Sequence, residues 1–359
     1  MLNKKIRILT VIISLAFSFQ AAADVERGDW GFVPIAAPFY TPDTSLGAGA
    51  FLLAYRDVVS GTGAGTDQFG IAGTYTLKNQ KSIAVTGDLV ITDYYRATGK
   101  LSYSNSSSDF WGLGPLTAEN DLEKITSEEY LAEGAFFRKM NQNLFIGPQV
   151  RIRSTEMTEI EDDGIFDNEA ITGYDGGIET GFGIIFIYDS TDSPFYPTRG
   201  ILIEGSTLTS STSAGSDYDY SSLKADFRYY YGITGKHVLA FQSVAELATE
   251  DVSYQSMSTI GGSRIMRGLP EGRFTDINSL AFQGEYRFPL TSFLAGVLFA
   301  SMGTVGSDVP ALVSIEDYHY AGGAGLRYLV DRKKHIAVRI DLGLSEEGLN
   351  VYFLFREAF

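Results

Sequence analysis

Apolar and polar side chains alternate with a period of two along most of this chain. In residues 336–344 every second position holds a branched aliphatic side chain: Ile336, Val338, Ile340, Leu342 and Leu344. The intervening positions include Arg339 and Asp341, and similar alternation starts at Leu223 and Leu280. A period of two predicts β-strands with one apolar and one polar face, and no comparable helical stripe follows the N-terminal segment. The sequence therefore predicts an all-β fold.

Such strands occur in soluble β-sandwiches and barrels, whose apolar face is the core, and in membrane barrels, whose apolar face meets lipid. The alternating segments span about 9–13 residues, close to the length that a tilted strand needs to cross a bilayer. Short connections alternate with long ones, as expected for tight periplasmic turns and larger outer loops. Charges of both signs lie in mid-strand on the polar face: Arg151, Arg153, Asp175, Glu179, Glu285, Arg287, Arg339 and Asp341. These features favour a transmembrane antiparallel β-barrel with a wet interior.

The alternation predicts about sixteen strands. They lie near residues 31–39, 45–56, 68–78, 81–92, 94–104, 127–139, 143–156, 173–189, 199–209, 219–232, 237–249, 277–288, 293–304, 318–330, 335–344 and 348–358. Only residues 40–44 separate the first two strands, which leaves fourteen strands as an alternative. The long outer loops are then 105–126, 157–172, 207–218, 250–276 and 305–317.

The first residues have the features of a targeting signal. Three basic residues precede an apolar stretch at 8–19, and alanines follow at 21–23. This pattern predicts a secretory signal peptide at 1–23, cleaved near Ala23. A retained membrane anchor would need about 20 apolar residues. We therefore expect export to the bacterial outer membrane, with residues 24–359 forming the barrel domain.

Composition excludes several classes of function. The chain has 28 basic and 44 acidic residues, a net charge of −16, and no Cys. A nucleic-acid binder needs a basic surface to displace phosphate counterions, so no nucleic acid is expected as a partner. Without Cys there are no disulfides, thiolate zinc sites or cysteine nucleophiles. His237, His319 and His335 are scattered and no G-x-S-x-G motif is present, so we expect neither an enzyme nor a cofactor.

One predicted outer loop is strongly acidic over residues 159–169. Its carboxylates are Glu159, Glu161, Asp162, Asp163, Asp167 and Glu169. They could collect divalent cations at a lipopolysaccharide surface. The ligand spacing of a calcium-binding loop is missing, so a solvated acidic loop is the favoured interpretation.

The predicted outer loop 250–276 has a different character. Within the run GGSRIMRGL it contains Gly261, Gly262, Met266, Arg267, Gly268 and Leu269. Glycine permits a tight backbone path, and the planar guanidinium of arginine can bind a carboxylate through two hydrogen bonds. We expect this loop to fold into the barrel and to place Arg267 among carboxylates of the wall.

Several motifs make a family resemblance visible. Residues 266–269 (MRGL) resemble the (V/I)RG(F/Y) loop signature of the BamA/TamA outer-membrane insertase superfamily, also called the bacterial surface antigen family. Residues 284–290 (GEYRFPL) resemble its E-x-R-F-P-L strand. Its D-x-x-D-x-x-x-x-P-x-x-G periplasmic turn is similar to the segment that contains Asp189, Asp192, Pro197 and Gly200. The resemblance covers roughly residues 30–359 and predicts the same barrel that the alternation predicts.

The resemblance implies that Arg267 pairs with Glu285 in the lumen. The family has a second carboxylate in an F-x-D-x-G strand, where this chain has Ser301. Glu285 alone would then hold Arg267, and we expect a less firmly anchored loop because an isolated buried pair is a weak source of stability. The family's barrels usually follow periplasmic POTRA domains, which we do not find in this sequence.

The implied role is to help insert or translocate proteins or lipids at the outer membrane. Outer-membrane lipids and lipopolysaccharide would be partners, and so would unfolded outer-membrane proteins or periplasmic proteins. Two other classes of function stay open: a passive, porin-like channel, and a structural surface protein without transport.

Two prolines indicate where the barrel wall is weak. Pro34 and Pro38 have equal parity in the first predicted strand, so both remove hydrogen-bond donors on the same side. We expect that side to face the last predicted strand, 348–358, across a lateral seam that also contains Phe355 and Phe359. The alternatives are that the prolines face the second strand, 45–56, or that they lie before the regular part of the first strand. A weak seam is what a lateral gate requires, and the resembled family is known for one.

Overall fold

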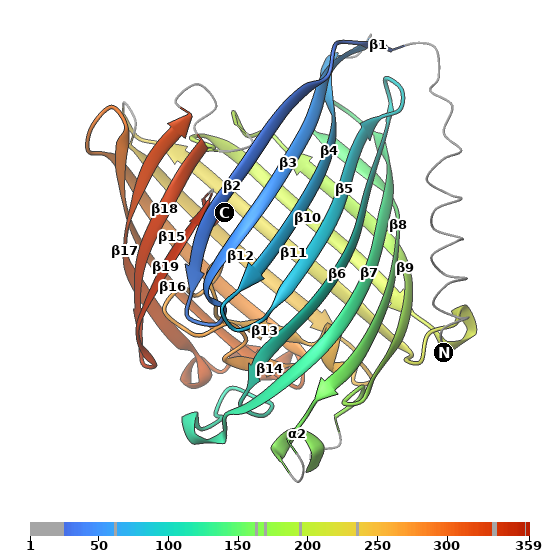
Figure 1. Cartoon of the computed structure of the whole chain (residues 1–359), viewed down its shortest axis with the longest axis vertical. Coiled ribbons are helices and arrows are strands. Elements are labelled where there is room, and N and C mark those ends of the chain that lie inside the picture. Colours follow the sequence, from blue (N-terminus) through green and yellow to red (C-terminus); the bar gives the residue numbers. More distant parts are fainter. Residues whose placement is uncertain are drawn as a thin grey trace.

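The structure is a computed structural model that describes residues 25–60, 63–161, 164–168, 171–193, 196–234, 237–331, 336–355 and 357–359. Sixteen antiparallel strands follow one another around a barrel, each paired with its neighbours in the sequence (Figure 1). The predicted signal peptide at 1–23 and its cleavage site lie outside the described residues.

The wall consists of the following strands: β2 (Gly31–Thr41), β3 (Ser45–Ser60), β4 (Gly63–Thr76), β5 (Lys81–Val90), β6 (Tyr95–Phe110), β7 (Glu123–Lys139), β8 (Leu144–Glu159), β9 (Gly176–Asp189), β10 (Gly200–Ser210), β11 (Tyr220–Gly232), β12 (Val238–Ala248), β15 (Asn278–Pro289), β16 (Leu294–Gly306), β17 (His319–Asp331), β18 (Ile336–Ser345) and β19 (Gly348–Phe355). The all-β barrel of sixteen strands is therefore confirmed, and the alternative of fourteen is wrong. The strands β2 and β3 pair without interruption from Gly31↔Tyr55 to Thr41↔Ser45, so the short segment between them is a hairpin turn.

Smaller elements decorate the wall. A short strand, β1 (Glu26–Arg27), pairs with β3 beyond the start of β2, and β13 (Ser258–Ile260) pairs with β14 (Phe274–Asp276) inside the loop that joins β12 to β15. The helical pieces are α2 (Ile165–Asn168) and the 3₁₀ turns η1 (Glu119–Asp121), η2 (Thr212–Ala214), η3 (Tyr254–Ser256), η4 (Pro310–Val313) and η5 (Ile315–Asp317). No helix in the described part of the chain is long and apolar enough to cross a membrane.

The two ends of the barrel differ. We call the end with the long loops the outer end, where α2, β13 and β14 lie, and the end with the shorter turns the inner end, where β1 lies (Figure 1). Several wall strands reach further toward the outer end than the alternation predicts. β6 continues to Phe110 and β7 starts at Glu123, which shortens the predicted 105–126 loop. Polar residues such as those of 104–109 still pair through their backbones but show no apolar alternation, so the pattern could not reveal them.

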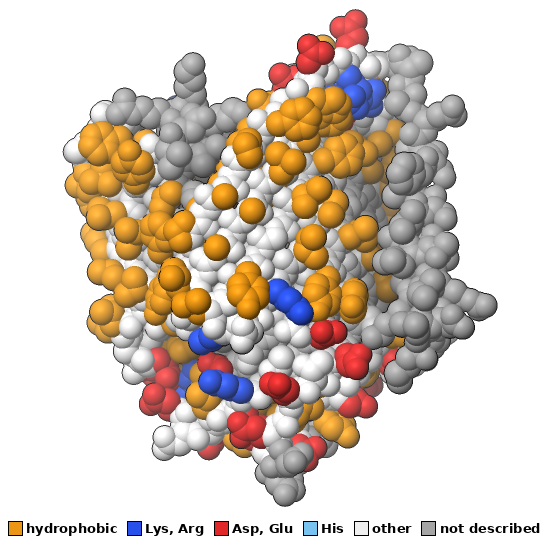
Figure 2. All heavy atoms as spheres, viewed as in Figure 1, with side chains coloured by type: hydrophobic (Ala, Val, Ile, Leu, Met, Phe, Trp, Pro, Cys, Tyr) orange, Lys and Arg blue, Asp and Glu red, His pale blue; other side chains and the backbone are white. Residues whose placement is uncertain are grey.

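The alternation places apolar side chains outward. On β9, for example, Phe182, Ile184 and Phe186 are exposed to 54%, 56% and 38%, although side chains of this size are usually buried in water-soluble proteins. Figure 2 shows such side chains across the middle of the visible face, with charged side chains mostly toward the two ends. An apolar band flanked by charges is the surface of a barrel that meets lipid.

The opposite faces of the same strands line the interior with ion pairs. On β9, Glu179 lies on the face opposite Phe182 and Ile184, is 3% exposed, and accepts hydrogen bonds from Arg153 Nη1 (3.4 Å) and from the Tyr220 hydroxyl (2.9 Å). The wall thus has the polar interior that the sequence predicts.

Candidate functional site

The loop between β12 and β15 folds into the barrel along a path that needs glycine. Gly261 has φ 113°, and a Cβ atom there would lie 2.0 Å from the carbonyl oxygen of Pro270. Gly268 has φ 123°, and its Cβ would lie 3.0 Å from the backbone of Leu344 in β18. Only glycine adopts such conformations and permits such approaches without strain. Met266 between them has φ 57°, a left-handed conformation that is unusual for a non-glycine residue.

Apolar contacts hold the loop in this position. Met266 and Leu269 are fully buried in a cluster that includes loop and wall residues: Ile260, Phe274, Ala281 and Val305. Gly262 has φ 107° where the chain enters this segment. The backbone N–H of Gly268 donates to the Tyr352 hydroxyl oxygen (3.1 Å), which ties the loop to β19.

Arg267 lies in the lumen against the wall formed by β15 to β18 and is fully buried. Its Nη2 atom donates to Glu285 Oε1 on β15, and its Nη1 atom donates to Asp341 Oδ2 on β18 at 3.0 Å. The guanidinium carbon lies 3.8 Å from the centre of the Phe299 ring. The loop is therefore bound to two separate strands of the wall through one planar fork.

The prediction that Glu285 alone holds Arg267 is wrong. The second carboxylate is Asp341, a residue whose place on the polar face of its strand was evident in the sequence. Ser301 is nearly buried on β16 and donates to the carbonyl oxygen of Ala321 (3.3 Å), away from this ion pair. The expected loose anchoring of the loop fails for the same reason, since Arg267 bridges two carboxylates.

Three more arginines surround the same two carboxylates. Arg287 Nε donates to Glu285 Oε2 (2.9 Å), Arg327 Nη1 to Asp341 Oδ1 (2.5 Å) and Arg339 Nη1 to Asp341 Oδ2 (2.7 Å). All three are at most 2% exposed. Buried charges are tolerated only when each is paired, so this network has to be assembled as a unit.

The last residues do not continue the wall. β19 ends at Phe355, and Phe359 lies inside the barrel, 7% exposed. Its ring stacks on Tyr230 of β11, with 6.4 Å between ring centres, and its carbonyl oxygen accepts a hydrogen bond from Arg287 Nη2 (3.0 Å). The prediction that a strand over 348–358 brings Phe359 to the lateral seam is wrong, because the buried arginine and the aromatic contact hold it in the lumen. Phe355 remains in β19, where it pairs with Val338 of β18.

The seam itself carries very little pairing. Among the described residues, β19 and β2 share one ladder pair, Phe353↔Tyr40, whereas β18 and β19 are paired over the whole length of β19. The ladder between β2 and β3 runs uninterrupted through Pro34 and Pro38. Because proline cannot donate, both must occupy non-hydrogen-bonded positions of that ladder, so their nitrogen atoms point away from β3 and toward the seam.

Side chains organise the turn between β9 and β10. Asp189 Oδ1 accepts hydrogen bonds from the backbone N–H and the hydroxyl of Thr191 (2.8 and 2.7 Å), and Asp192 Oδ1 accepts one from the backbone of Thr198 (2.8 Å). Burial would raise the pKa of Asp192, but these bonds outweigh it and hold the pKa below its usual value. Pro197 is buried. Gly200 has φ 111°, and a Cβ atom added there would lie 2.4 Å from the carbonyl oxygen of Ser190, so only glycine fits. The motif that resembles the family turn is thus a structural turn.

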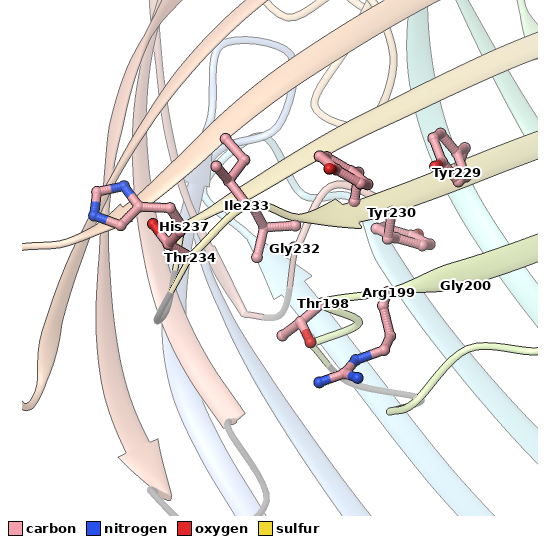
Figure 3. Close-up of a pocket in the computed structure, with 11 residues that line it drawn as sticks. Thr198, Arg199, Gly200, Tyr229, Tyr230, Gly232, Ile233, Thr234 and His237 are labelled. Carbon is pink, nitrogen blue, oxygen red and sulfur yellow. The ribbon is translucent and has the colours of Figure 1, made fainter.

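Two cavities accompany these features. One of about 460 Å³ lies at the inner end, between this turn and the turn after β11; Figure 3 shows Thr198 and Arg199 on one side and Tyr229 and Tyr230 on the other. The other, about 450 Å³, lies in the lumen between loop 250–276 and the strands β9 to β12. The cavity in the lumen is lined by side chains of both charges, among them Lys224, Asp226 and Glu246.

For the acidic loop, the structure gives no test. Asp162, Asp163 and Glu169 lie outside the described residues. Among the described residues no group of three or more His, Asp or Glu side chains is placed to hold a metal ion. Glu159 belongs to the end of β8, where its Oε2 accepts a hydrogen bond from Thr126 (3.2 Å).

The tip of loop 250–276 contacts the turn between β2 and β3 and brings two carboxyl groups together there. The backbone N–H of Glu271 donates to Asp43 Oδ1 (2.9 Å). Burial, and then repulsion from Asp43, raises the pKa of Glu271 above its ordinary value of 4.5, and burial raises the pKa of Asp43 as well. A carboxyl group whose pKa is raised by folding stabilises the folded state at low pH, and this contribution is lost as the pH rises toward the folded-state pKa.

We therefore expect the loop to become more sensitive to protease as the pH rises from about 4 to about 7. Replacing Glu271 by Gln should remove most of this dependence, because the neutral amide does not titrate. Limited proteolysis of folded protein at several pH values measures the effect. Equal pH dependence in the parent and in Glu271→Gln would contradict the assignment.

Together, the fold and the site define a transmembrane antiparallel β-barrel whose lumen is occupied by an arginine-bearing loop and whose first and last strands scarcely pair. A family model described as the Omp85 superfamily domain matches residues 60–330, so the chain belongs to the Omp85 superfamily. This confirms the resemblance inferred from the sequence motifs, and the membership implies an outer-membrane location.

Solved structures agree on the fold. The chain superposes on BamA from Haemophilus ducreyi lacking POTRA domains 1–3 with a TM-score of 0.65 at 14% identity, covering 92% of this chain and 70% of that one. For CdiB from Acinetobacter baumannii the TM-score is 0.59 at 11% identity, with 94% of this chain and 60% of that chain covered. For CdiB from Escherichia coli the TM-score is 0.59 at 12% identity, with 94% of this chain and 63% of that chain covered. The chain thus spans less than two thirds of either CdiB. No curated protein matches.

Proposed function

We propose that this barrel helps to insert or translocate proteins or lipids at the outer membrane, by opening laterally between β2 and β19. The observation that carries the proposal is the seam, with one ladder pair between two strands that each pair fully with their other neighbour. Unpaired strand edges are templates for another chain, and backbone groups facing lipid are costly unless they are paired. A strand edge in this position is therefore suited to a passing client.

The loop supports the proposal over a passive channel. The loop with Arg267 and Met266 lies in the lumen against β15 to β19, and the tail residue Phe359 lies in the lumen against β11 and β15. A porin needs an open aqueous path. We expect little steady conductance when the protein is reconstituted in planar bilayers, whereas a porin-like barrel would conduct at once.

Crosslinking in living cells tests the proposal directly. A photoreactive amino acid at Phe32 on β2 or Val351 on β19, both exposed near the seam, should capture a protein or lipid client. The same group at Phe182, exposed on β9 in the opposite part of the wall, is the matched control and should capture only bulk lipid. Equal adducts at seam and control positions would contradict a lateral route.

A further inference from the structure

The three residues at the end of the sequence occupy a defined site in the lumen. Arg327 Nε donates to Glu357 Oε2 (2.7 Å), and Arg287 Nη2 donates to the carbonyl oxygen of Phe359 (3.0 Å). Ala358 and Phe359 are buried in a cluster with Tyr230 and Ala240. The site therefore has two fixed cations and an aromatic platform, which match an acid two residues before an aromatic ring.

The ring of Phe359 also completes an aromatic cage around Arg287. The guanidinium carbon of Arg287 lies 5.5 Å from the ring centres of Tyr196 and Phe359 and 5.6 Å from that of Tyr230. Such contacts are strongest where water is excluded, and Arg287 is fully buried. The tail is thus part of the environment that keeps this charge in the lumen.

The same two arginines also hold the carboxylates that anchor the loop. Glu285 bridges Arg267 to Arg287, and Asp341 bridges Arg267 to Arg327. Two parallel chains of buried ion pairs therefore connect the loop to the tail: one ends on Phe359 and the other on Glu357. If Arg267 moved away, Glu285 and Asp341 would each lose one of the charges that they share with the arginines that bind the tail.

The register of the seam shows what the tail would do if it left this site. Two steps beyond Phe353↔Tyr40, a straight β19 would place Phe355 opposite Pro38, and Phe359 would come opposite Pro34. At both positions β2 has no N–H to donate. At the seam the tail would therefore lack two of the hydrogen bonds that a proline-free edge would offer, and its docking in the lumen keeps the seam short.

We propose that the lumen carries a binding site for an acid-x-aromatic peptide segment, that residues 357–359 fill it as a latch, and that the loop controls its occupancy through Arg267. With the latch docked, β19 separates from β2 on the inner side of Tyr40. With the latch released, β19 is free to pair along β2 or to leave the β2 edge to another strand. This regulation rests on the lateral gate proposed above.

Cysteine labelling tests the latch. The chain has no Cys, so Ala358→Cys, at a position 4% exposed, is a unique reporter. In the folded mature protein we expect slow reaction with a maleimide, and at least a tenfold faster reaction when Phe359→Ala or Arg287→Gln removes a direct contact. In the region that the structure describes, Arg267 makes no hydrogen bond or ion pair with the tail, but the change Arg267→Gln should also accelerate labelling several-fold, through the two carboxylates.

Arg273→Gln is the matched control. Arg273 is a second buried arginine of the same loop, but it pairs with Glu347 and Thr117, and within the described part of the chain no hydrogen bond or ion pair joins it to the tail. If Arg267→Gln and Arg273→Gln label alike, or if the parent reporter labels as fast as unfolded protein, the proposal is overturned. Arg267→Lys provides a second variant should Arg267→Gln fail to fold, and it should label at an intermediate rate because an ammonium cannot reproduce the planar fork.

Labelling requires no client, so its outcome is separate from that of the gate. If Arg267→Gln does not accelerate labelling but photocrosslinked adducts still form only at the seam, the latch is wrong and the gate stands. If Arg267→Gln accelerates labelling but no adducts form at the seam, the latch controls the shape of the lumen and the transport role is wrong.

Discussion

Replacing Arg267 by Ala is expected to lower the free energy of unfolding by about 3–5 kcal/mol, because it leaves Glu285 and Asp341 buried with fewer partners. Both carboxylates are fully inaccessible to solvent, so water cannot replace the guanidinium. Folded and unfolded fractions of membrane barrels separate by heat-modifiable mobility in gels, which measures the change across a urea series. The loop should also lose its protease resistance.

Arg151→Ala is the matched control for this prediction. Arg151 pairs with Glu133 on the lumen side of the wall, but both side chains are about one third exposed. Ion pairs with access to water contribute about 0–1 kcal/mol, so the control should remain close to the parent. Equal losses for the two variants would show that Arg267 is not the anchor of the loop.

The double variant Arg267→Ala/Glu285→Ala extends the same test. Because residues in one network are coupled, removing both partners should cost less than the sum of the single losses, by about 1 kcal/mol or more. Strict additivity would mean that the two side chains do not form a pair in the folded protein.

Replacing Gly343 by Ala is the second change with a large expected effect. A Cβ atom at this position of β18 would lie 2.7 Å from the backbone of Arg267 and Gly268, so the loop must move away from the wall. Overpacking of this kind costs about 1–3 kcal/mol, and the loop should become accessible to protease while the barrel stays folded.

Gly73→Ala serves as the control for this steric argument. Gly73 lies in β4, and the nearest atom to an added Cβ there is the carbonyl oxygen of Ser82 at 3.7 Å. This is ordinary contact, so stability and proteolysis should match the parent. If Gly343→Ala also matches the parent, the close approach of the loop to β18 is wrong.

The alternation of side chains was sufficient to predict the wall. Lipid on one side and water on the other force every wall strand into the same period of two, so even the number of strands could be read from the sequence. Strand ends were less predictable. Beyond the lipid band, segments such as 104–109 are polar on both faces, and only backbone pairing keeps them in the sheet.

The centre of the site was predictable only in part. The glycines and Arg267 of loop 250–276 indicated an inward fold, and the resemblance supplied Glu285 as a partner. The second partner was missed because register decides which lumen-facing carboxylate meets the loop, and Asp341 comes within reach only when β18 lies beside the loop at Gly343. The available signal was that Asp341 lies on the polar face of β18, two residues after Arg339.

The path of the tail could not be predicted from local pattern. Residues 348–358 alternate like any other strand, yet β19 ends at Phe355. The contacts that hold the tail are distant in the sequence: Arg287 and Tyr230 bind Phe359 in the lumen, while the β2 edge lacks donors at Pro34 and Pro38. Competition between two binding places for one segment has no signature in the pattern of that segment.

Hydrogen exchange of backbone amides in lipid nanodiscs tests the central claim most directly. We expect the amides of β2 that face the seam to exchange quickly, while those of β6 and β7, which pair along their full length, stay protected. Protection of β2 and β19 equal to that of β6 and β7 would mean that the wall is uniformly closed, and it would contradict a gate at this seam.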